Sequence, residues 1–209
     1  MKLYSYWRSS TSYRLRIALR LKDISFETVP VDLLAGGQNE DNYLSLNPSG
    51  GVPSLVLDDG AVLTQSMAML EYLEAVYPTP SMIPSDPLDA TMVRAAANII
   101  ACDIHPVNNL KIISALKGLG HSQGQTVTWI NDWMLQGLQS YQAALPQGTM
   151  FSFGNTPTVA DICLVPQLYN AHRWGTDLSS LTRLTEIEAR CLALPAFASA
   201  HPDLQPDAK

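Results

Sequence analysis

A proline-rich stretch divides the chain and constrains its fold more than any other feature. Residues 78–87 read P-T-P-S-M-I-P-S-D-P, so four of these ten positions are proline. Proline has no backbone N–H to donate and a fixed φ, so a segment this rich in proline continues neither a helix nor a central strand. We therefore expect a linker at residues 81–87, between one domain at residues 1–80 and a second at residues 88–209.

The first 80 residues alternate between strand and helix patterns. A strand–helix–strand unit comes first and needs a parallel crossover, whereas the two strands around Asp58-Asp59-Gly60 predict an antiparallel hairpin. The sheet should therefore be mixed, and helices can cover both of its faces. The strands are expected at residues 2–6, 26–31, 53–57 and 61–64, and the helices at residues 13–22 and 69–77.

Only helical patterns follow the linker, which predicts an all-α second domain and an overall fold class of α/β plus all-α. Thr158 and Asp161 have the spacing of a capping box, which marks where one buried helix begins. No internal repeat or coiled-coil heptad is present. The helices are expected at residues 88 to about 117, 125–145, 159 to about 173, and 183–194.

Composition excludes several classes of partner. The net charge is -6 and only 15% of residues are charged, so no basic surface is available for nucleic acid. No apolar run approaches the ~20 residues of a membrane span, and the start of the sequence lacks the pattern of a signal peptide. We expect a cytoplasmic protein that binds neither nucleic acid nor membrane.

The cysteine and histidine residues predict no metal site and no disulfide framework. Cys102, Cys163 and Cys191 are odd in number, far apart, and form no C-x-x-C pair. The histidines have no metal-ligand spacing with one another. We expect all three cysteines to be reduced residues of the core.

A run of hydroxyl residues follows the first predicted strand. Residues 9–12 read S-S-T-S at the start of a helix, and Arg8 precedes them. Unpaired N–H groups and the helix dipole favour an anion at such a place. The simpler interpretation is one N-cap within a solvated loop, but four hydroxyls exceed the needs of a cap. A thiolate would suit the position, and since no cysteine is present there, the thiol would have to arrive with a ligand.

Two further features point to the same kind of ligand. Val52 precedes Pro53 at the start of a strand, so its backbone is free to pair with an extended peptide, particularly if the Val52–Pro53 bond is cis. Gln65 and Ser66 open a helix and can bind a carboxylate. Taken singly, a turn proline and an N-cap serine are the simpler interpretations. Taken together, these features describe a binding site for a short, acidic peptide that bears a thiol.

The same stretches carry a resemblance that extends over nearly the whole chain. S-S-T-S-Y-R-L-R-I-A-L, L-N-P-S-G-G-V-P, Q-S-M-A-M-L-E-Y-L-E and I-H-P-V-N-N-L resemble motifs of the zeta class of glutathione transferases, the maleylacetoacetate and maleylpyruvate isomerases. The resemblance implies a thioredoxin-like N-terminal domain that binds glutathione. It also implies a helical C-terminal domain for substrate binding and dimerisation, a homodimer, and glutathione as a cofactor that is not consumed. Thr11 departs from the pattern, because most of the class has cysteine there.

The resemblance also assigns residues to roles. It implies that Ser9 supports the glutathione thiolate, with Arg8, Ser10 and Thr11 completing the catalytic group. His105 is taken as a glutathione contact rather than a general base. The residues implied for substrate carboxylates are Arg8, Lys111 and Arg173. The residues implied for glutathione are Ser9, Ser10, Thr11, Ser12, Tyr13, Arg14, Gln38, Val52, Pro53, Gln65, Ser66, Asp103, His105, Asn109, Leu110 and Lys111.

The implied activity is cis–trans isomerisation of maleylpyruvate or maleylacetoacetate in aromatic and tyrosine breakdown. Addition of a thiolate to the conjugated carbon makes the double bond single, so that it can rotate before the thiolate leaves. Preorganised donors stabilise the negative charge that develops, and arginine suits the carboxylates of a dicarboxylate substrate. Two alternatives stay open: a transferase that consumes glutathione on α-halo acids, and a binding protein without catalysis.

Overall fold

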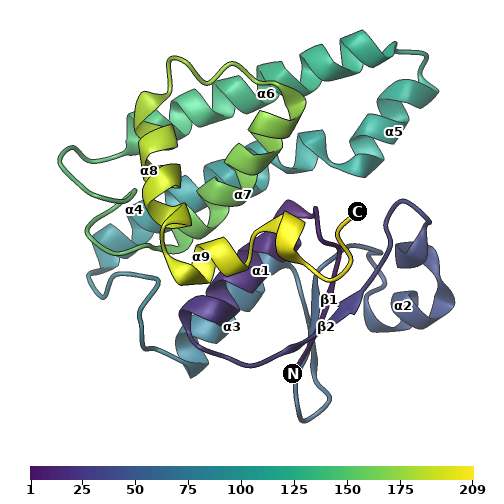
Figure 1. Cartoon of the computed structure of the whole chain (residues 1–209), viewed down its shortest axis with the longest axis horizontal. Coiled ribbons are helices and arrows are strands. Elements are labelled where there is room, and N and C mark those ends of the chain that lie inside the picture. The colour runs from purple at the N-terminus through teal and green to yellow at the C-terminus, as the bar shows by residue number, and fades with distance from the viewer. The chain divides into compact units, whose positions relative to one another are not determined.

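A four-stranded mixed sheet with the strand order β2-β1-β3-β4 organises the N-terminal part of the chain. β1 (Lys2–Ser5) pairs in parallel with β2 (Glu27–Pro30) and antiparallel with β3 (Ser54–Val56). β3 pairs antiparallel with β4 (Val62–Thr64), and the hairpin that joins them is the predicted one. The mixed sheet expected from the sequence is confirmed (Figure 1).

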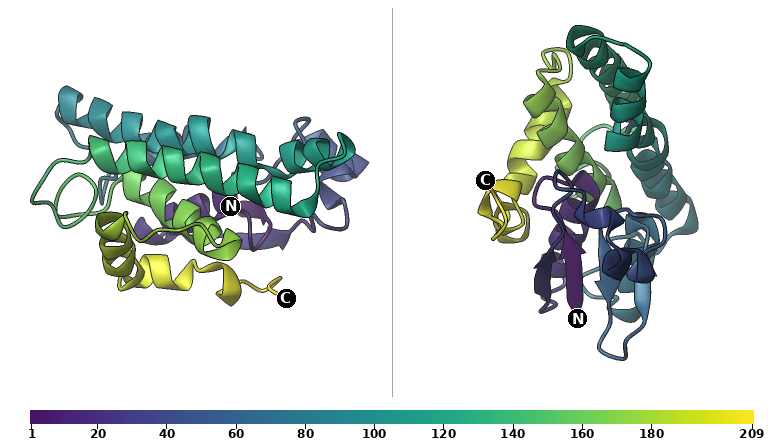
Figure 2. Two further views of the ribbon diagram at one scale, coloured as in Figure 1. Left: turned by 90° about the horizontal axis from the view of Figure 1, so that it is seen from above. Right: turned by 90° about the vertical axis from the view of Figure 1, so that its right-hand side faces the viewer.

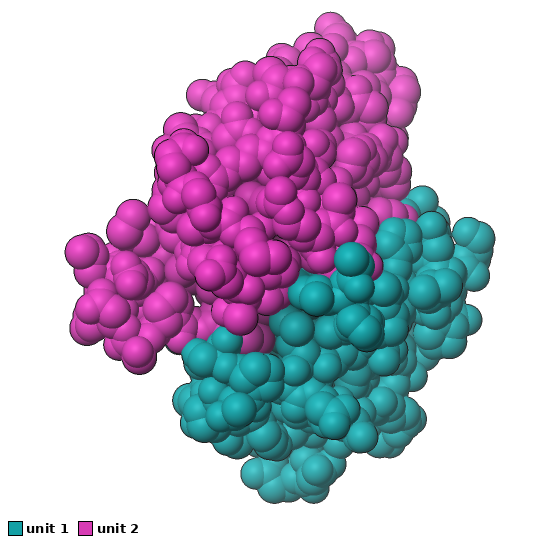
Figure 3. All heavy atoms as spheres, turned by 60° about the vertical axis from the view of Figure 1, so that its left-hand side comes forward, with its two compact units in different colours: residues 1–81, 193–209 teal, residues 82–192 magenta.

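The computed structural model describes all 209 residues, and the chain forms two units. Unit 1 consists of Met1–Ser81 together with Ala193–Lys209, and unit 2 consists of Met82–Leu192 (Figure 3). The sequence patterns assign residues 193–209 to the second domain, at residues 88–209, whereas in the structure they belong to unit 1. No helix is long and apolar enough to cross a bilayer.

Helices lie on both faces of the sheet in unit 1. α1 (Ser10–Leu21) and α3 (Ser66–Val76) pack against each other, and their apolar sides join Leu3 and Leu55 of the sheet in a fully buried core. Strand residues alternate between the two faces, so Tyr4 points away from Leu3.

The other face of the sheet is covered by a helix that the sequence patterns did not indicate. On this face the ring of Tyr4 lies 6.1 Å from that of Tyr43, which belongs to α2 (Asp41–Leu46). The Tyr43 hydroxyl reaches Ser54 Oγ at 3.0 Å, and burial raises the pKa of this tyrosine. A short 3₁₀ turn, η1 (Gly37–Asn39), precedes α2.

Residues 193–209 form α9 (Pro195–Ser199) and the 3₁₀ turn η4 (Pro202–Leu204), and α9 packs on α1. The contact buries the guanidinium of Arg16 completely and lets its Nε donate to the Ala200 carbonyl at 3.0 Å. This segment therefore covers the polar face of α1 that carries Arg16.

Unit 2 is all-helical, as expected. α7 is buried along most of its length and packs on α4, α6 and α8 (Figure 2). The predicted capping box forms at its start, where the Asp161 carboxylate accepts the N–H of Thr158 at 2.8 Å. The elements are α4 (Pro87–Asn98), the π-helical η2 (Ile99–Ile104), the 3₁₀ turn η3 (Pro106–Asn108), α5 (Leu110–Gly118), α6 (Gln123–Ala144), α7 (Val159–Trp174) and α8 (Thr182–Leu192).

Two expectations about unit 2 are wrong. The single helix expected from residue 88 to about 117 is divided, because Pro106 has no N–H to donate and Asn109 caps a new helix with its side chain. Cys163 and Cys191 are buried, and burial raises the pKa of the Cys191 thiol, but Cys102 is exposed on the π-helical segment. Cys102 is therefore not a core residue.

Gly137 allows α6 to pack closely on the π-helical segment. A Cβ at this position would lie 2.2 Å from Cγ1 of Ile104, which is fully buried and has no room to move aside. We expect Gly137→Ala to lower the free energy of unfolding by about 1–3 kcal/mol, as overpacking does. Gly118→Ala is the control, because a Cβ there meets nothing within 4 Å. Urea unfolding compares the two variants, and equal stability would contradict the packing argument.

Candidate functional site

The start of α1 is built around the side chain of Ser9. Ser9 has extended backbone angles, φ -68° and ψ 122°, and its Oγ accepts the N–H of Ser12 at 3.3 Å. Ser9 is therefore the N-cap of α1, which begins three residues before the predicted helix at residue 13. The cap also places the Ser9 hydroxyl at the positive end of the helix dipole.

A chain of hydroxyl groups connects this cap to Val52. Thr11 Oγ1 donates to the Val52 carbonyl at 2.8 Å and lies 2.9 Å from Ser9 Oγ. Since a threonine hydroxyl has one proton and Val52 takes it, Ser9 is the donor in the Ser9–Thr11 bond. A thiolate beside Ser9 would compete with Thr11 for that proton and, as an anion, would form the stronger bond.

Helical periodicity divides the hydroxyl run into two faces. Arg8, Ser9 and Thr11 are half-buried and open to solvent. Ser10 and Ser12 are buried, as are Tyr13 and Arg14, so a ligand would meet Ser9 and Thr11 first. The predicted glutathione contacts of the four buried residues stay predictions.

The start of α3 is a second site that favours an anion. Gln65 precedes the helix with φ +68°, a left-handed conformation that costs a non-glycine residue about 1–3 kcal/mol. Its side chain is exposed and makes no capping hydrogen bond to this 11-residue helix. Strain of this kind at an exposed position is typical of a functional site.

Arg14 supplies positive charge beneath the same helix start. Its side chain is only 1% exposed, and its Nη1 donates to Ser66 Oγ at 3.2 Å. Its Nε and Nη2 make no hydrogen bond, and no carboxylate pairs with it. A buried guanidinium without a counter-ion is unfavourable, so a carboxylate bound at Ser66 would be stabilised by it.

Backbone and amide groups for a peptide lie in the same unit. The Val52–Pro53 bond is cis, as hypothesised from the sequence, and Val52 lies outside the β1–β3 ladder, which starts at Ser54. Gln38 lies in η1, and its side-chain Oε1 is buried without a partner. The backbone carbonyl of Gln38 lies so close to Gly50 that a Cβ at position 50 would be 3.3 Å from it. Unit 1 therefore offers groups for a thiol, a carboxylate and an extended peptide, which is the chemistry of glutathione.

The predicted residues of unit 2 lie around the junction of η2, η3 and α5. His105 ends the π-helical segment and is half-buried. Asn109 is the N-cap of α5, where its Oδ1 accepts the N–H of Lys111 at 3.0 Å, so its side chain is engaged in a structural bond. Asp103, Leu110 and the side chain of Lys111 are exposed.

Arg173 lies in the last turn of α7, with its guanidinium 4.8 Å from the ring centre of Trp174. Asn131 of α6 donates to the Trp174 carbonyl at 3.4 Å. The preceding residues of α6 hold the η3 turn, because Trp129 Nε1 donates to the Val107 carbonyl at 3.0 Å. One stretch of α6 thus brings the end of α7 and the η3 turn together within unit 2.

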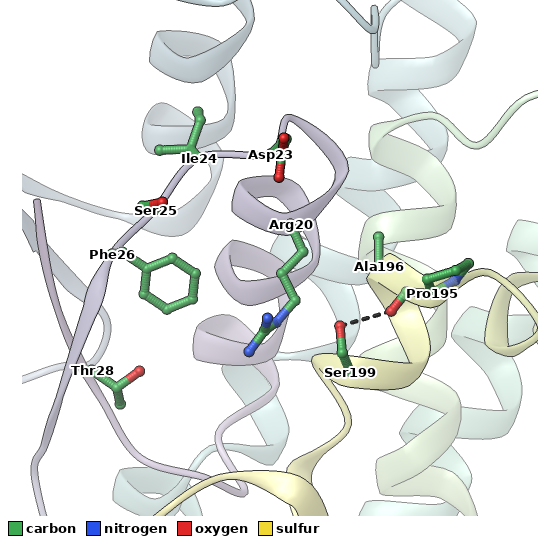
Figure 4. Close-up of a pocket in the computed structure, with 9 residues that line it drawn as sticks. All are labelled: Arg20, Asp23, Ile24, Ser25, Phe26, Thr28, Pro195, Ala196 and Ser199. Atoms are coloured by element: carbon green, nitrogen blue, oxygen red, sulfur yellow. Dashed lines mark hydrogen bonds between the residues drawn. The ribbon is translucent and has the colours of Figure 1, made fainter.

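None of the predicted site residues lines the cavity of about 440 Å³ in unit 1. That cavity lies between the end of α1 and α9, where Arg20 stands between the ring of Phe26 and Ser199 (Figure 4). Its Ser199 hydroxyl donates to the Pro195 carbonyl at 2.7 Å.

Sequence reasoning did not predict that Asp207 and Arg16 contact Trp7, in the loop before α1. Trp7 N–H donates to Asp207 Oδ2 at 2.9 Å, and Arg16 Nη2 donates to the Trp7 carbonyl at 2.9 Å. Trp7 and Asp207 are 200 residues apart, so no spacing rule could have linked them.

Comparisons with known proteins agree with the geometry. Residues 1–75 match the family model for the glutathione S-transferase N-terminal domain. The maleylacetoacetate isomerase of Pseudomonas aeruginosa is 44% identical over 210 residues, which cover 99% of this chain and 98% of that protein.

Two solved structures are similar over their whole length. A bacterial maleylpyruvate isomerase, described as a zeta-class glutathione S-transferase in its holo form, is 42% identical with a TM-score of 0.97, and both chains are fully covered. The maleylacetoacetate isomerase of Methylobacterium extorquens AM1, solved with bound malonate and glutathione, is 34% identical with a TM-score of 0.96, again with full coverage of both chains.

Proposed function

This chain belongs to the zeta class of glutathione transferases, and we propose that it is a glutathione-dependent cis–trans isomerase of maleylpyruvate or maleylacetoacetate. The observation that carries the proposal is the half-buried Ser9 hydroxyl at the N-cap of α1, linked through Thr11 to Val52. The arrangement offers one proton to a thiolate at the positive end of a helix.

Bound glutathione supplies the thiolate nucleophile that makes isomerisation of a conjugated double bond feasible. Ser9 holds its proton toward the sulfur and so favours the ionised thiol. The Thr11 proton is committed to the Val52 carbonyl at 2.8 Å, so Thr11 only accepts from Ser9, and the Ser9 proton is the one that can turn to the sulfur. The Thr11 hydroxyl is a strong donor to the Val52 carbonyl, whereas a cysteine at this position would have only a weak S–H donor.

The peptide portion of glutathione fits the remaining groups of unit 1. The γ-glutamyl carboxylate is proposed to bind at the start of α3, where Ser66 and the helix N–H groups face it and Arg14 lies beneath. Val52 is proposed to pair with the cysteinyl backbone, and Gln38 to bind the glycine end. Ser10, Ser12, Tyr13 and Pro53 shape the site from the interior.

Arg8 is proposed to bind a carboxylate of the substrate. Its guanidinium lies 5.1 Å from the ring centre of Trp7, an arrangement that holds the planar group in place without using its N–H donors. Arg173 and Lys111 stay predicted substrate residues, and Asp103, His105, Asn109 and Leu110 stay predicted glutathione residues.

The decisive experiment follows maleylpyruvate absorbance with purified protein, with and without glutathione, while free thiol is counted. Glutathione-dependent conversion to the fumaryl isomer with no net loss of thiol supports the isomerase. Stoichiometric loss of thiol with an α-halo acid, without isomerisation of either maleyl compound, would instead favour the transferase. A role in aromatic or tyrosine breakdown follows from the isomerase activity, and a cytoplasmic location stays a prediction that cell fractionation tests.

A homodimer is proposed to form through α4. Leu88 and Met92 of this helix are 68% and 42% exposed, and Ala95 continues the same stripe at helical spacing. An exposed apolar stripe of this kind is typical of an interface. We expect Met92→Glu to shift the protein from dimer to monomer, because the charge would be buried against a second copy. Light scattering after gel filtration measures the mass, with Gln136→Glu at an exposed position of α6 as the control, and an unchanged mass in Met92→Glu would exclude this face.

A further inference from the structure

The peptide groups of Trp7 are held on both sides by charged residues. Its N–H donates to Asp207 Oδ2 at 2.9 Å, and its carbonyl accepts from Arg16 Nη2 at 2.9 Å. Hydrogen bonds to charged groups are stronger than those between neutral groups. Trp7 directly precedes Arg8 and Ser9, so these two bonds fix the backbone that carries both residues.

Residues 193–209 hold the Trp7 peptide groups in two ways, through Arg16 and through Asp207. Arg16 is fully buried and also donates to the Ala200 carbonyl at 3.0 Å and to Ser5 Oγ at 3.3 Å, which sets the position of its guanidinium. Asp207 approaches the loop directly. The segment therefore reaches the peptide of Trp7 once through Arg16 and once through its own carboxylate.

An ion pair holds the segment beside a second loop of unit 1. Lys209 Nζ lies 2.8 Å from Asp32 Oδ2, and the hydrogen bond from Lys209 lowers the pKa of Asp32 while raising that of Lys209. Asp32 also accepts the N–H groups of Leu34 and Ala35 with its other oxygen. The segment therefore contacts the rest of unit 1 on either side of Asp207, at Ala200 through Arg16 and at Lys209 through this exposed ion pair.

The carboxylate of Asp207 is only half satisfied by hydrogen bonds. Its Oδ1 is buried and has no hydrogen-bond partner, which is unfavourable for a carboxylate oxygen. The only hydrogen bond of this carboxylate goes to the Trp7 N–H. A half-buried carboxylate with one unsatisfied oxygen, whose other oxygen binds the loop that carries Ser9, is consistent with a positioning role.

We propose that Asp207 is a positioning residue that holds the Trp7–Ser9 loop in its reactive geometry. The loop is short, because Ser9 N–H donates back to the Tyr6 carbonyl at 3.0 Å, so a shift at Trp7 passes directly to Ser9. The Trp7 ring is buried and lies against Arg8, so the same shift moves the guanidinium. The inference rests on the proposed function, since it assigns Asp207 to the thiolate and carboxylate groups of that site.

The test compares Asp207→Ala and Asp207→Asn with Asp203→Ala, which removes an exposed aspartate from the same segment. Three quantities are measured well below each variant's melting temperature: kcat, KM, and the pKa of the glutathione thiol in the complex from its thiolate absorbance. We expect Asp207→Ala to lower kcat at least about tenfold, since a misplacement of ~1 Å can cost ~10²-fold. The thiol pKa should rise in the same variant, whereas Asp207→Asn, which keeps an acceptor, should recover part of both.

Each outcome separates this inference from the proposed function. If the wild-type protein lowers the thiol pKa and Asp207→Ala keeps that pKa and kcat while losing only stability, Asp207 is structural and the inference is overturned alone. If the wild-type protein does not lower the thiol pKa, the proposed function fails and the inference fails with it. Wild-type values in Asp203→Ala confirm that loss of a charge in this segment is not itself the cause.

Discussion

Replacing Ser9 with alanine lowers kcat for the maleyl substrates by about 10²–10³-fold, the usual loss when one preorganised donor is removed from a developing anion. The structure gives the reason, since Ser9 Oγ carries the one proton of the Ser9–Thr11–Val52 chain that can turn to a thiolate. The pKa of the bound glutathione thiol should rise in the same variant. Steady-state kinetics and thiolate absorbance measure the two effects.

The N-cap role of Ser9 has to be separated from its catalytic role. Ser9→Ala also loses the bond to the Ser12 N–H, which costs about 1 kcal/mol of stability, whereas Ser9→Gly loses only a few tenths. Both variants should lose the same activity, because both lack the hydroxyl. Ser45→Ala removes an exposed hydroxyl of α2 in the same unit and should change neither quantity. Full activity in Ser9→Gly would refute the assignment of the thiolate to Ser9.

Replacing Asp161 with alanine should lower the free energy of unfolding by about 3–5 kcal/mol, because several buried donors lose their acceptor at once. Asp161 is fully buried and accepts the N–H groups of Ser152 and Thr158, each at 2.8 Å, and the Thr158 hydroxyl at 3.1 Å. The carboxylate therefore joins the start of α7 to the preceding loop. Urea unfolding followed by circular dichroism measures the loss.

Two further variants test whether the acceptor geometry causes this effect. Asp161→Asn keeps one acceptor oxygen but turns an NH₂ group toward a donor, so its stability should lie between that of wild type and that of Asp161→Ala. Asp177→Ala removes an exposed carboxylate that accepts the Ser179 N–H at 3.0 Å, and should cost less than about 1 kcal/mol. Similar losses in Asp161→Ala and Asp177→Ala would show that burial of Asp161 contributes little.

The local patterns predicted the elements that depend on neighbours in the chain. The mixed sheet followed from a crossover unit and a hairpin, and the capping box at Thr158 followed from a fixed spacing. The anion site that includes Ser9 is predicted because four hydroxyl residues before a helix exceed the needs of a cap. The helix that begins at Asp41 was not indicated, because its six residues are too few to show a period.

Local sequence patterns were enough to predict a mixed α/β part followed by an all-helical part, and a site at the hydroxyl run for an acidic ligand that bears a thiol. Those features depend on short-range rules of capping, periodicity and proline geometry. Only the tertiary structure decided that Arg14 is buried without a carboxylate and that Gln65 adopts a left-handed conformation. It also decided that Asp207 returns to the loop of Trp7, because burial and charge pairing depend on which distant segment covers a residue.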